Sequence, residues 1–257
     1  MQQLFSMVIL QLMFSSCNYT APSSSLINTK KITLTNPYKQ IITIPLPQGF
    51  QRVAADSGSF TGYLRNIELK ENKTVYLYNG NPKQNQTAQY AILNISTGNK
   101  DLQQCADAVM RLRAEYLFIQ KQYDQIIFYD NDKTAYQFSP PYTQNNFTKY
   151  LGRVFGMCGS ASLSKQLKPV GNFLNIQPGD VIIRGGFPGH AVIVMDVAFN
   201  VYGEKIYLLA QSYMPAQDIH VLKNPANTDL SPWYQVSDDT FIETPEYSFT
   251  KNELKRW

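Results

Sequence analysis

The chain has 257 residues but only two histidines, His190 and His220, so any imidazole chemistry depends on one of them. His190 stands in the stretch QPGDVIIRGGFPGHAVIVMDVA (177–198), which reads as a strand, a glycine-rich turn and a second strand that opens with the histidine. Glycine lets other atoms approach the backbone closely. This setting predicts His190 as a general base, although a structural histidine at a strand end is the plain alternative.

The chain has three cysteines that could supply a nucleophile for such a base. Cys105 falls in the first turn of a helix predicted over 101–121, where amide N–H groups and the helix dipole favour a thiolate. A thiolate paired with a histidine is the core of cysteine acyl-transfer catalysis. Cys158, in a glycine-flanked turn before another predicted helix, is the rival nucleophile, and the capped helix favours Cys105. Cys105 lies on the apolar stripe of its helix and could instead be a buried core cysteine, and the spacing of the two residues leaves a Cys105–Cys158 disulfide open.

The third member of the constellation should orient the imidazole through its other nitrogen. Gln211 is the polar residue of an otherwise apolar strand, IYLLAQSY, and a hairpin would place it beside His190. His220 on the following strand is an alternative, whereas Asp196 lies too far along the strand of His190. An oxyanion donor is also required. Its candidates are the side chains of Gln103 and Gln104 and the backbone amide of Cys105.

The elements that must position these residues follow from periodicity and turn residues. The helix over 101–121 has an apolar stripe at helical spacing, and Asp101 with Gln104 resembles a capping box. Further helices are predicted at 146–155 and 160–167. Strands are predicted at 41–45, 63–65, 75–78, 90–95, 180–184, 190–197, 205–211 and 217–222. Helices segregated from an antiparallel sheet indicate an α+β fold.

The N-terminal residues differ in composition from the rest of the chain. Residues 1–16 carry no charged side chain and contain a short apolar run, which is typical of a signal peptide. Phe14-Ser15-Ser16-Cys17 resembles a loose lipobox, which predicts a lipid-anchored Cys17 at the bacterial cell envelope, with simple secretory cleavage as the alternative. Residues 17–40 are predicted to be a tether, and 41–257 a single domain.

Composition also excludes some classes of function. The net charge is +4 and no dense run of Lys and Arg is present, so nucleic-acid binding is not expected. No Cys/His cluster has the spacing of a metal site. We therefore expect no metal and no cofactor.

The pattern PGDVIIRGGFPGHAVIVMDV resembles the Pro-Gly-Asp and Gly-His strands of NlpC-type peptidases and of the related CHAP amidases. That resemblance implies a papain-like fold, in which an antiparallel sheet packs against an N-terminal helix that carries the nucleophile. Cys105, His190 and Gln211 match its order of cysteine, histidine and polar third residue. The sequence departs from the family at the nucleophile, where Gln104-Cys105-Ala106-Asp107 replaces the usual Asp-Cys-Ser-Gly.

A second resemblance covers nearly the whole mature chain. The blocks GFQRVAADSGSFTGYLRNIELK, DLQQCADAVMRLRAEYL, PGHAVIVMD and LLAQSYMPAQDIHVLKNP are similar to the family of domain of unknown function 4846. These blocks contain the three triad candidates but not Cys158. They also contain Arg65, Arg113 and Tyr213, which either line the same cleft or form structural contacts, the latter being favoured for Arg113.

Together these patterns predict an exported, lipid-anchored cysteine hydrolase that cleaves peptide or amide bonds of the cell wall. Cys105 would be the nucleophile, His190 the general base and Gln211 the orienting residue. Its partners would be a cell-wall peptide or glycan and, through the lipid, the membrane. The alternatives are a catalytically silent envelope module that binds glycan or peptide, and an acyl transferase that runs the same chemistry with an amine in place of water.

Overall fold

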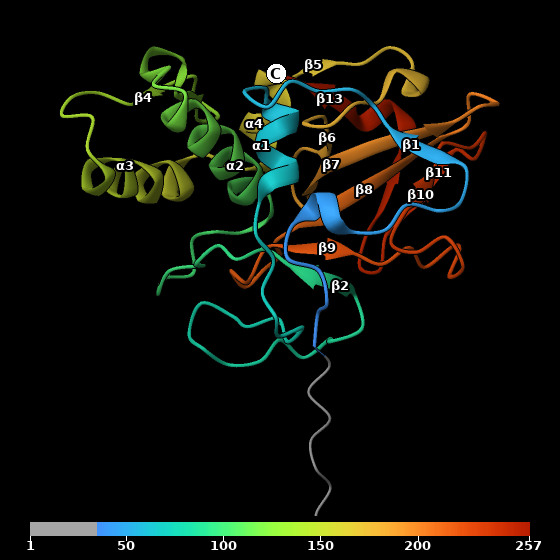
Figure 1. Cartoon of the computed structure of the whole chain (residues 1–257). Coiled ribbons are helices and arrows are strands. Elements are labelled where there is room, and N and C mark those ends of the chain that lie inside the picture. Colours follow the sequence, from blue (N-terminus) through green and yellow to red (C-terminus); the bar gives the residue numbers. More distant parts are fainter. Residues whose placement is uncertain (1–34) are drawn as a thin grey trace, which may run out of the picture. The chain divides into compact units, whose positions relative to one another are not determined.

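A computed structural model describes residues 35–257 of the chain (Figure 1). The predicted signal peptide, the predicted lipidation at Cys17 and the first part of the predicted tether lie outside the described residues. The last part of that tether segment contacts the domain, since Thr35 pairs with Asn72 and Gln40 with Glu68 in isolated antiparallel bridges.

The domain is built on a nine-stranded sheet in which every pairing is antiparallel. The main path runs β2-β9-β8-β7-β6-β13-β5, while β1 pairs with β7 and β10 pairs with β8. The strands are β1 (Phe50–Arg52), β2 (Gln89–Ile92), β5 (Lys168–Pro169), β6 (Val181–Arg184), β7 (His190–Asn200), β8 (Lys205–Gln211), β9 (His220–Leu222), β10 (Tyr234–Gln235) and β13 (Leu254–Arg256).

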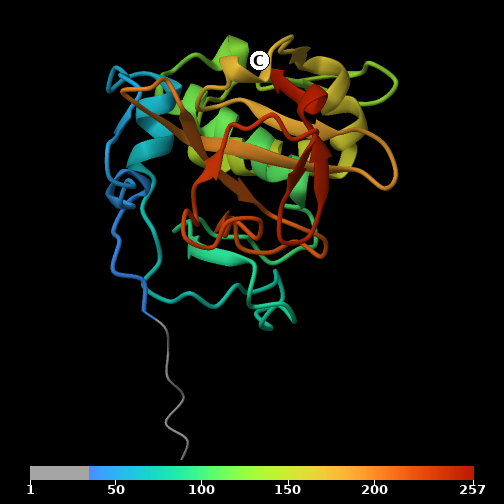
Figure 2. The same cartoon turned by 90° about the vertical axis from the view of Figure 1, so that its right-hand side faces the viewer.

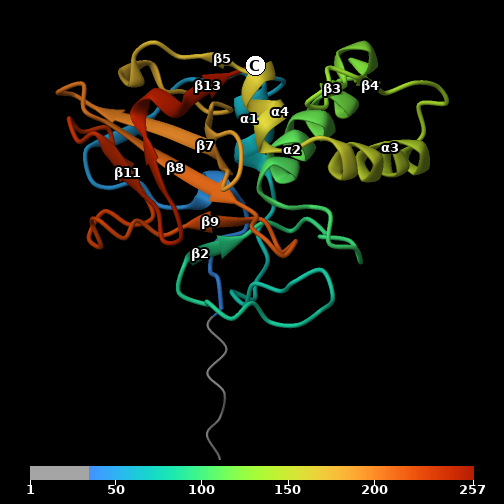
Figure 3. The ribbon, with the colours of Figure 1, turned by 180° about the vertical axis from the view of Figure 1, so that it is seen from behind.

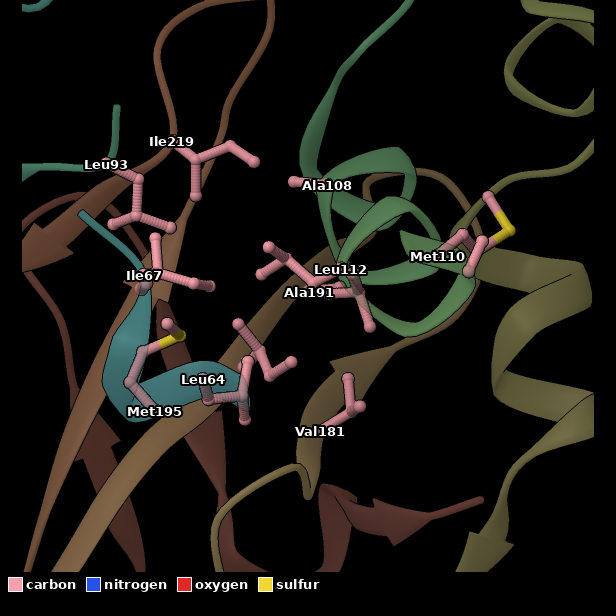
Figure 4. Packing of buried hydrophobic residues seen from close by; sticks show 14 of the residues in the cluster. Leu64, Ile67, Leu93, Ala108, Met110, Leu112, Val181, Ala191, Met195 and Ile219 are labelled. Atoms are coloured by element: carbon pink, nitrogen blue, oxygen red, sulfur yellow. The ribbon is translucent and has the colours of Figure 1, made fainter. Parts of the chain in front are cut away.

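The helices gather on one face of this sheet (Figures 1 and 3). They are α1 (Phe60–Asn66), α2 (Cys105–Ile119), α3 (Gln144–Met157) and α4 (Ser160–Gln166), with short 3-10 turns η1 (Ile41–Thr43), η2 (Tyr123–Gln125), η3 (Phe173–Asn175) and η4 (Lys251–Glu253). The main core lies between helices and sheet, where Leu64 of α1 and Leu112 of α2 meet Ala191 and Met195 of β7 (Figure 4). Burial of these apolar side chains holds α2 on β7.

The opposite face of the sheet is covered by chain from the C-terminal third. The hairpin of β11 (Phe241–Glu243) and β12 (Ser248–Thr250) lies over it (Figure 2), and its Ile242 and Phe249 join Val192, Val194 and Leu209 in a second core. A further hairpin, β3 (Ile127–Tyr129) with β4 (Ala135–Gln137), precedes α3. Because both faces are packed, β7 and β8 are apolar almost throughout. The predicted α+β class with a large antiparallel sheet is confirmed.

Several local predictions were wrong. The apolar run at 41–45 forms η1 rather than a strand, and Tyr63–Arg65 lies inside α1. The Ser59 side chain caps α1 by accepting the amide of Gly62 at 3.1 Å, and one turn of helix then buries Leu64. The segment 75–78 makes only isolated bridges, at Tyr76 and Leu77.

The N-terminus of the long helix was also misplaced. α2 begins at Cys105 with Gln104 as its N-cap, four residues later than predicted. The backbone amide of Gln104 donates to Asp107 at 3.0 Å. Asp101 instead accepts the amide of Ala216 at 2.7 Å, so it ties the loop before the helix to the loop after β8. Among residues 35–257, no helix has the length and apolar character needed to cross a membrane.

Candidate active site

Cys105 is the first residue of α2 and its thiol lies against the start of β7. The backbone amides of Cys105, Ala106 and Ala191 hydrogen-bond to the sulfur and lower its pKa, as expected for a helix N-terminus. Burial opposes them more strongly, and the neighbouring Asp107 adds to its effect, so the pKa of the Cys105 thiol is raised to about 11. The predicted position is therefore found, but the predicted ease of ionisation is not.

His190 and Gln211 meet where the β7–β8 hairpin opens. His190 is the first residue of β7 and Gln211 the last of β8, and the register, in which Ile193 pairs with Ala210, brings Gln211 close to His190 diagonally across the ladder. The Nε2 atom of His190 lies 2.8 Å from Oε1 of Gln211, and both side chains are buried. The pairing that the sequence predicts is present.

A carboxylate behind Gln211 fixes the direction of this hydrogen bond. Gln211 donates its Nε2 to Glu246 at 2.8 Å, and an ionised carboxylate can only accept. Oε1 of Gln211 must therefore face His190, whose Nε2 must carry the hydrogen. In the neutral imidazole the lone pair is then on Nδ1, which is the nitrogen left to accept a proton.

Glu246 is itself held by two donors. Lys83 donates to its Oε2 at 2.5 Å and Asn85 to its Oε1 at 3.0 Å. A chain of polar contacts thus runs from Lys83 through Glu246 and Gln211 to His190. Gln211 has one partner on either side, and Glu246 is held by Lys83 and Asn85, which restricts the imidazole to one orientation.

Aromatic rings enclose the imidazole. The rings of Tyr213, Tyr247 and Phe249 have centroids 4.7, 5.0 and 5.8 Å from that of His190. Burial lowers the pKa of His190 to about 4, although the Gln211 hydrogen bond and Glu246 work in the other direction. At neutral pH the site therefore rests as a thiol and a neutral imidazole.

Cys105 and His190 line one cavity of about 480 Å³. Tyr213, Met214 and Tyr247 form part of its wall, and the glycine-rich turn before β7 forms another part. A Cβ at Gly189 would lie 2.4 Å from the carbonyl oxygen of Gly186 and 2.4 Å from Oγ of Ser160, so the tight turn, packed against the start of α4, requires glycine there. The close approach that the glycines permit is thus a packing contact beside the site.

Cys158 lines the same cavity. It directly follows the last residue of α3. Cys158 and Cys105 are both free thiols, so the disulfide that the sequence left open is not formed. Burial raises the pKa of Cys158 to about 12, and the charges of Asp130 and Asp107 add to the effect. Cys158 stands between α3 and the N-cap of α4, so it is not in the first turn of a helix as Cys105 is.

Asp107 is a buried acid on this cavity wall. One carboxyl oxygen accepts the Gln104 amide, and the other has no hydrogen-bond partner among the described residues. Burial raises the pKa of Asp107 well above its usual value. Protonation of this group would favour a thiolate at Cys105, because an ionised Asp107 repels it.

The other candidates have different roles in the structure. His220 pairs with Gln211 across the β8–β9 ladder, and its Nδ1 contacts the carbonyl of Asp218 at 2.9 Å. Asp196 forms buried ion pairs with Arg52 and Arg65 at 2.6 and 2.7 Å. Neither His220 nor Asp196 orients His190.

The two glutamine side chains considered as oxyanion donors also make other contacts. The Gln103 side chain accepts a hydrogen bond from Arg111 and lines a separate cavity. Gln104 borders the cavity of Cys105, but its side chain donates to Asp101 at 3.1 Å. The backbone amide of Cys105 remains as the candidate within the site, and at rest it hydrogen-bonds to the sulfur of Cys105 itself.

Of the three further residues shared with the family motifs, one joins the site. The ring of Tyr213 lies against the imidazole of His190, tilted by 57°. Arg65 is structural, through Asp196. Arg113 lies on the rings of Phe60, Tyr116 and Trp257 in another part of the molecule.

Glu246, Lys83 and Tyr247 were not predicted. Glu246 and Tyr247 stand in the turn between β11 and β12, and Lys83 in a loop before β2, so no periodicity links them to the histidine. Within residues 35–257, no group of three or more His, Cys, Asp or Glu side chains is arranged to hold a metal ion.

No curated protein and no solved structure matches the chain. A family model does match, over residues 41–142 and 130–256, and these two segments include Cys105, His190 and Gln211. Because the match covers most of the chain, the protein belongs to the family described as domain of unknown function (4846).

Proposed function

We propose that the protein is an exported, lipid-anchored cysteine hydrolase that cleaves peptide or amide bonds in the bacterial cell wall. The observation that carries the proposal is the hydrogen bond of 2.8 Å between His190 and Gln211, with Glu246 fixing its direction, in the cavity that also holds Cys105. A buried histidine needed only for packing has no requirement for one tautomer. A general base does, because its lone pair must face the proton that it accepts.

The proposed reaction has two steps. Nδ1 of His190 takes the Cys105 proton as the sulfur attacks the substrate carbonyl, and the imidazolium then protonates the leaving amine as the carbon–nitrogen bond breaks. Water, deprotonated by the same nitrogen, hydrolyses the thioester and restores the thiol. The first amides of α2 are not used within the helix, and that of Cys105 would stabilise the oxyanion.

The arrangement also supports a papain-like architecture. A helix that begins with the cysteine packs on the strand that begins with the histidine, and the polar third residue lies on the next strand. This is the order on which the resemblance to NlpC-type and CHAP enzymes rests. We keep the papain-like fold and the envelope location as parts of the proposal.

One observation favours a second candidate function. The pKa of Cys105 is raised to about 11 and that of His190 lowered to about 4, so the resting site holds no thiolate–imidazolium pair. A silent module that binds cell-wall peptide or glycan in the same cavity fits this observation. The two functions differ in whether a bound substrate is cleaved.

The test uses purified peptidoglycan fragments and the full chain, with new amino groups detected by mass spectrometry. We expect cleavage by the wild type and by Cys158→Ala, and none by Cys105→Ala or His190→Ala. Cys158→Ala is the matched control because it removes a thiol from the same cavity. Cleavage that depends on Cys158 and not on Cys105 would contradict the assignment. Saturable fragment binding without cleavage, unchanged in Cys105→Ala, would favour the silent module.

A further inference from the structure

A second cavity, of about 730 Å³, shares no lining residue with the candidate active site. It lies along α2, at Arg113, which follows Cys105 by eight residues, or about 12 Å at 1.5 Å per residue. Its charged lining residues are three cations, Arg113, Lys205 and Arg256, and one acid, Asp180. The side chains on its wall therefore carry a net charge of +2 (three cations minus one acid).

The single acid is already neutralised. Asp180, from the Pro-Gly-Asp motif, accepts two hydrogen bonds from Arg256 at 2.6 and 2.8 Å and one from the amide of Gln177 at 3.0 Å. Arg256 is thus committed to a forked ion pair. The motif builds this second cavity and takes no part in the cavity of His190.

Arg113 has no such partner. No acidic group of residues 35–257 forms an ion pair with its guanidinium, and it donates no hydrogen bond to another residue in that range. Burial lowers its pKa. A half-buried cation without a counter-ion among residues 35–257 is costly, which makes the place favourable for an anion.

Aromatic rings hold the Arg113 guanidinium in place. It lies 5.1 Å from the ring centroid of Phe60 and 5.7 Å from that of Trp257. Phe60 is fixed in turn against Gly179, where a Cβ would come within 2.7 Å of the ring and where φ is +90°. The cation–π contacts orient the guanidinium but leave its N–H groups unused.

Trp257 and Lys205 also line the cavity. The indole Nε1 of Trp257 is buried and has no hydrogen-bond partner among the described residues. Lys205 donates to the carbonyl of Leu174 at 2.6 Å, which a lysine can do while two of its protons stay available. The cavity therefore offers the unpaired guanidinium of Arg113 and the ammonium group of Lys205 as donors, while its one acidic side chain is already paired.

We propose that this cavity binds an anionic ligand through a carboxylate or phosphate group that pairs with the Arg113 guanidinium, with Lys205 as a further donor. The planar fork of arginine suits both groups. This site is independent of the proposed hydrolase activity.

The experiment follows Trp257 fluorescence in the full chain, titrated with inorganic phosphate in one arm and acetate in the other, with sodium chloride at matched ionic strength as reference. The difference between the wild type and Trp257→Phe isolates the signal of this indole from that of Trp233, the only other tryptophan. We expect a saturable change with at least one of the two anions. The anion that gives it assigns the group as phosphate or carboxylate.

Variants then locate the binding. Arg113→Gln should weaken it about tenfold or more, because a charge-assisted hydrogen bond is lost. Arg153→Gln removes an equal charge from an exposed position on α3 and should leave it unchanged. If Arg113→Gln fails to fold, as judged by thermal unfolding, Lys205→Gln is used, with weaker binding expected. The proposal is overturned if neither anion changes the Trp257 fluorescence more than sodium chloride does. It is also overturned if the variant at Arg113 or Lys205 binds the anion as tightly as Arg153→Gln does.

Discussion

The reactivity of Cys105 tests the electrostatics of the candidate active site most directly. The perturbation is pH, and the reagent is a small neutral disulfide, 2-hydroxyethyl disulfide, which only a thiolate attacks. With a pKa of about 11, about 0.1% of Cys105 is thiolate at pH 8, against about a quarter of an ordinary thiol of pKa about 8.5. The thiolate fraction is therefore about 240-fold smaller.

A more basic thiolate is also a better nucleophile. With a Brønsted coefficient of about 0.4–0.5, a difference of about 2.5 pKa units makes it about 10- to 18-fold faster. The net expectation is that Cys105 reacts about 13- to 24-fold more slowly than a free thiol at pH 8. The rate should then rise tenfold per pH unit between pH 8 and 10, because the fraction of thiolate does.

The assay is mass spectrometry of the mixed disulfide on Cys105 over time, in a Cys158→Ala background. Glutathione at the same pH serves as the reference thiol. A rate that stays constant from pH 6 to pH 9, and that His190→Ala abolishes, would refute the reasoning. That result would mean that a thiolate–imidazolium pair exists at rest and that burial does not dominate at Cys105.

Two further predictions concern the contacts that hold the site and the sheet. Glu246→Gln frees the Gln211 amide to turn, which should mix the two tautomers of His190. Activity should fall about 10- to 100-fold, because a charge-assisted hydrogen bond contributes about 1.5–3 kcal/mol. Nitrogen NMR of the imidazole distinguishes the tautomers, and a variant that keeps only the Nε2–H tautomer would contradict the role given to Glu246. Asp196→Asn leaves Arg65 buried without its counter-ion and should cost about 3–5 kcal/mol in urea unfolding. The control is Glu71→Gln, in an exposed ion pair with Lys39, for which little or no change in stability is expected.

The sequence predicts well those elements whose pattern is long or whose ends carry clear turn residues. The strand at 205–211 and the helix near 146–155 are found almost as predicted, and His190 opens its strand. Short apolar segments were misread, because three residues such as Tyr63–Arg65 fit a strand and a helix equally well. Their state depends on the tertiary contacts around them.

The site could be predicted as far as its residues lie on regular elements. The contact between His190 and Gln211 follows from one hairpin. Glu246 follows Gln211 by 35 residues and comes from the turn of a separate hairpin, so nothing local indicates it. The pKa of Cys105 was predicted in the wrong direction because helix amides are visible in a sequence and the burial of one side chain is not.

The resting state, with a neutral thiol at Cys105 and a neutral imidazole at His190, affects the rate of the proposed reaction. It does not decide whether the reaction takes place. Moving a proton from a thiol of pKa about 11 to an imidazole of pKa about 4 costs roughly 9 kcal/mol for independent groups. Attraction between the resulting charges returns about 4 kcal/mol at a separation of about 4 Å and an effective dielectric constant of about 20. The remaining cost of about 5 kcal/mol fits within the total barrier of about 16 kcal/mol that corresponds to about 10 turnovers per second. A neutral pair held by Gln211 and Glu246 is therefore compatible with catalysis in which proton transfer accompanies attack, and what it excludes is a thiolate stored before the substrate arrives.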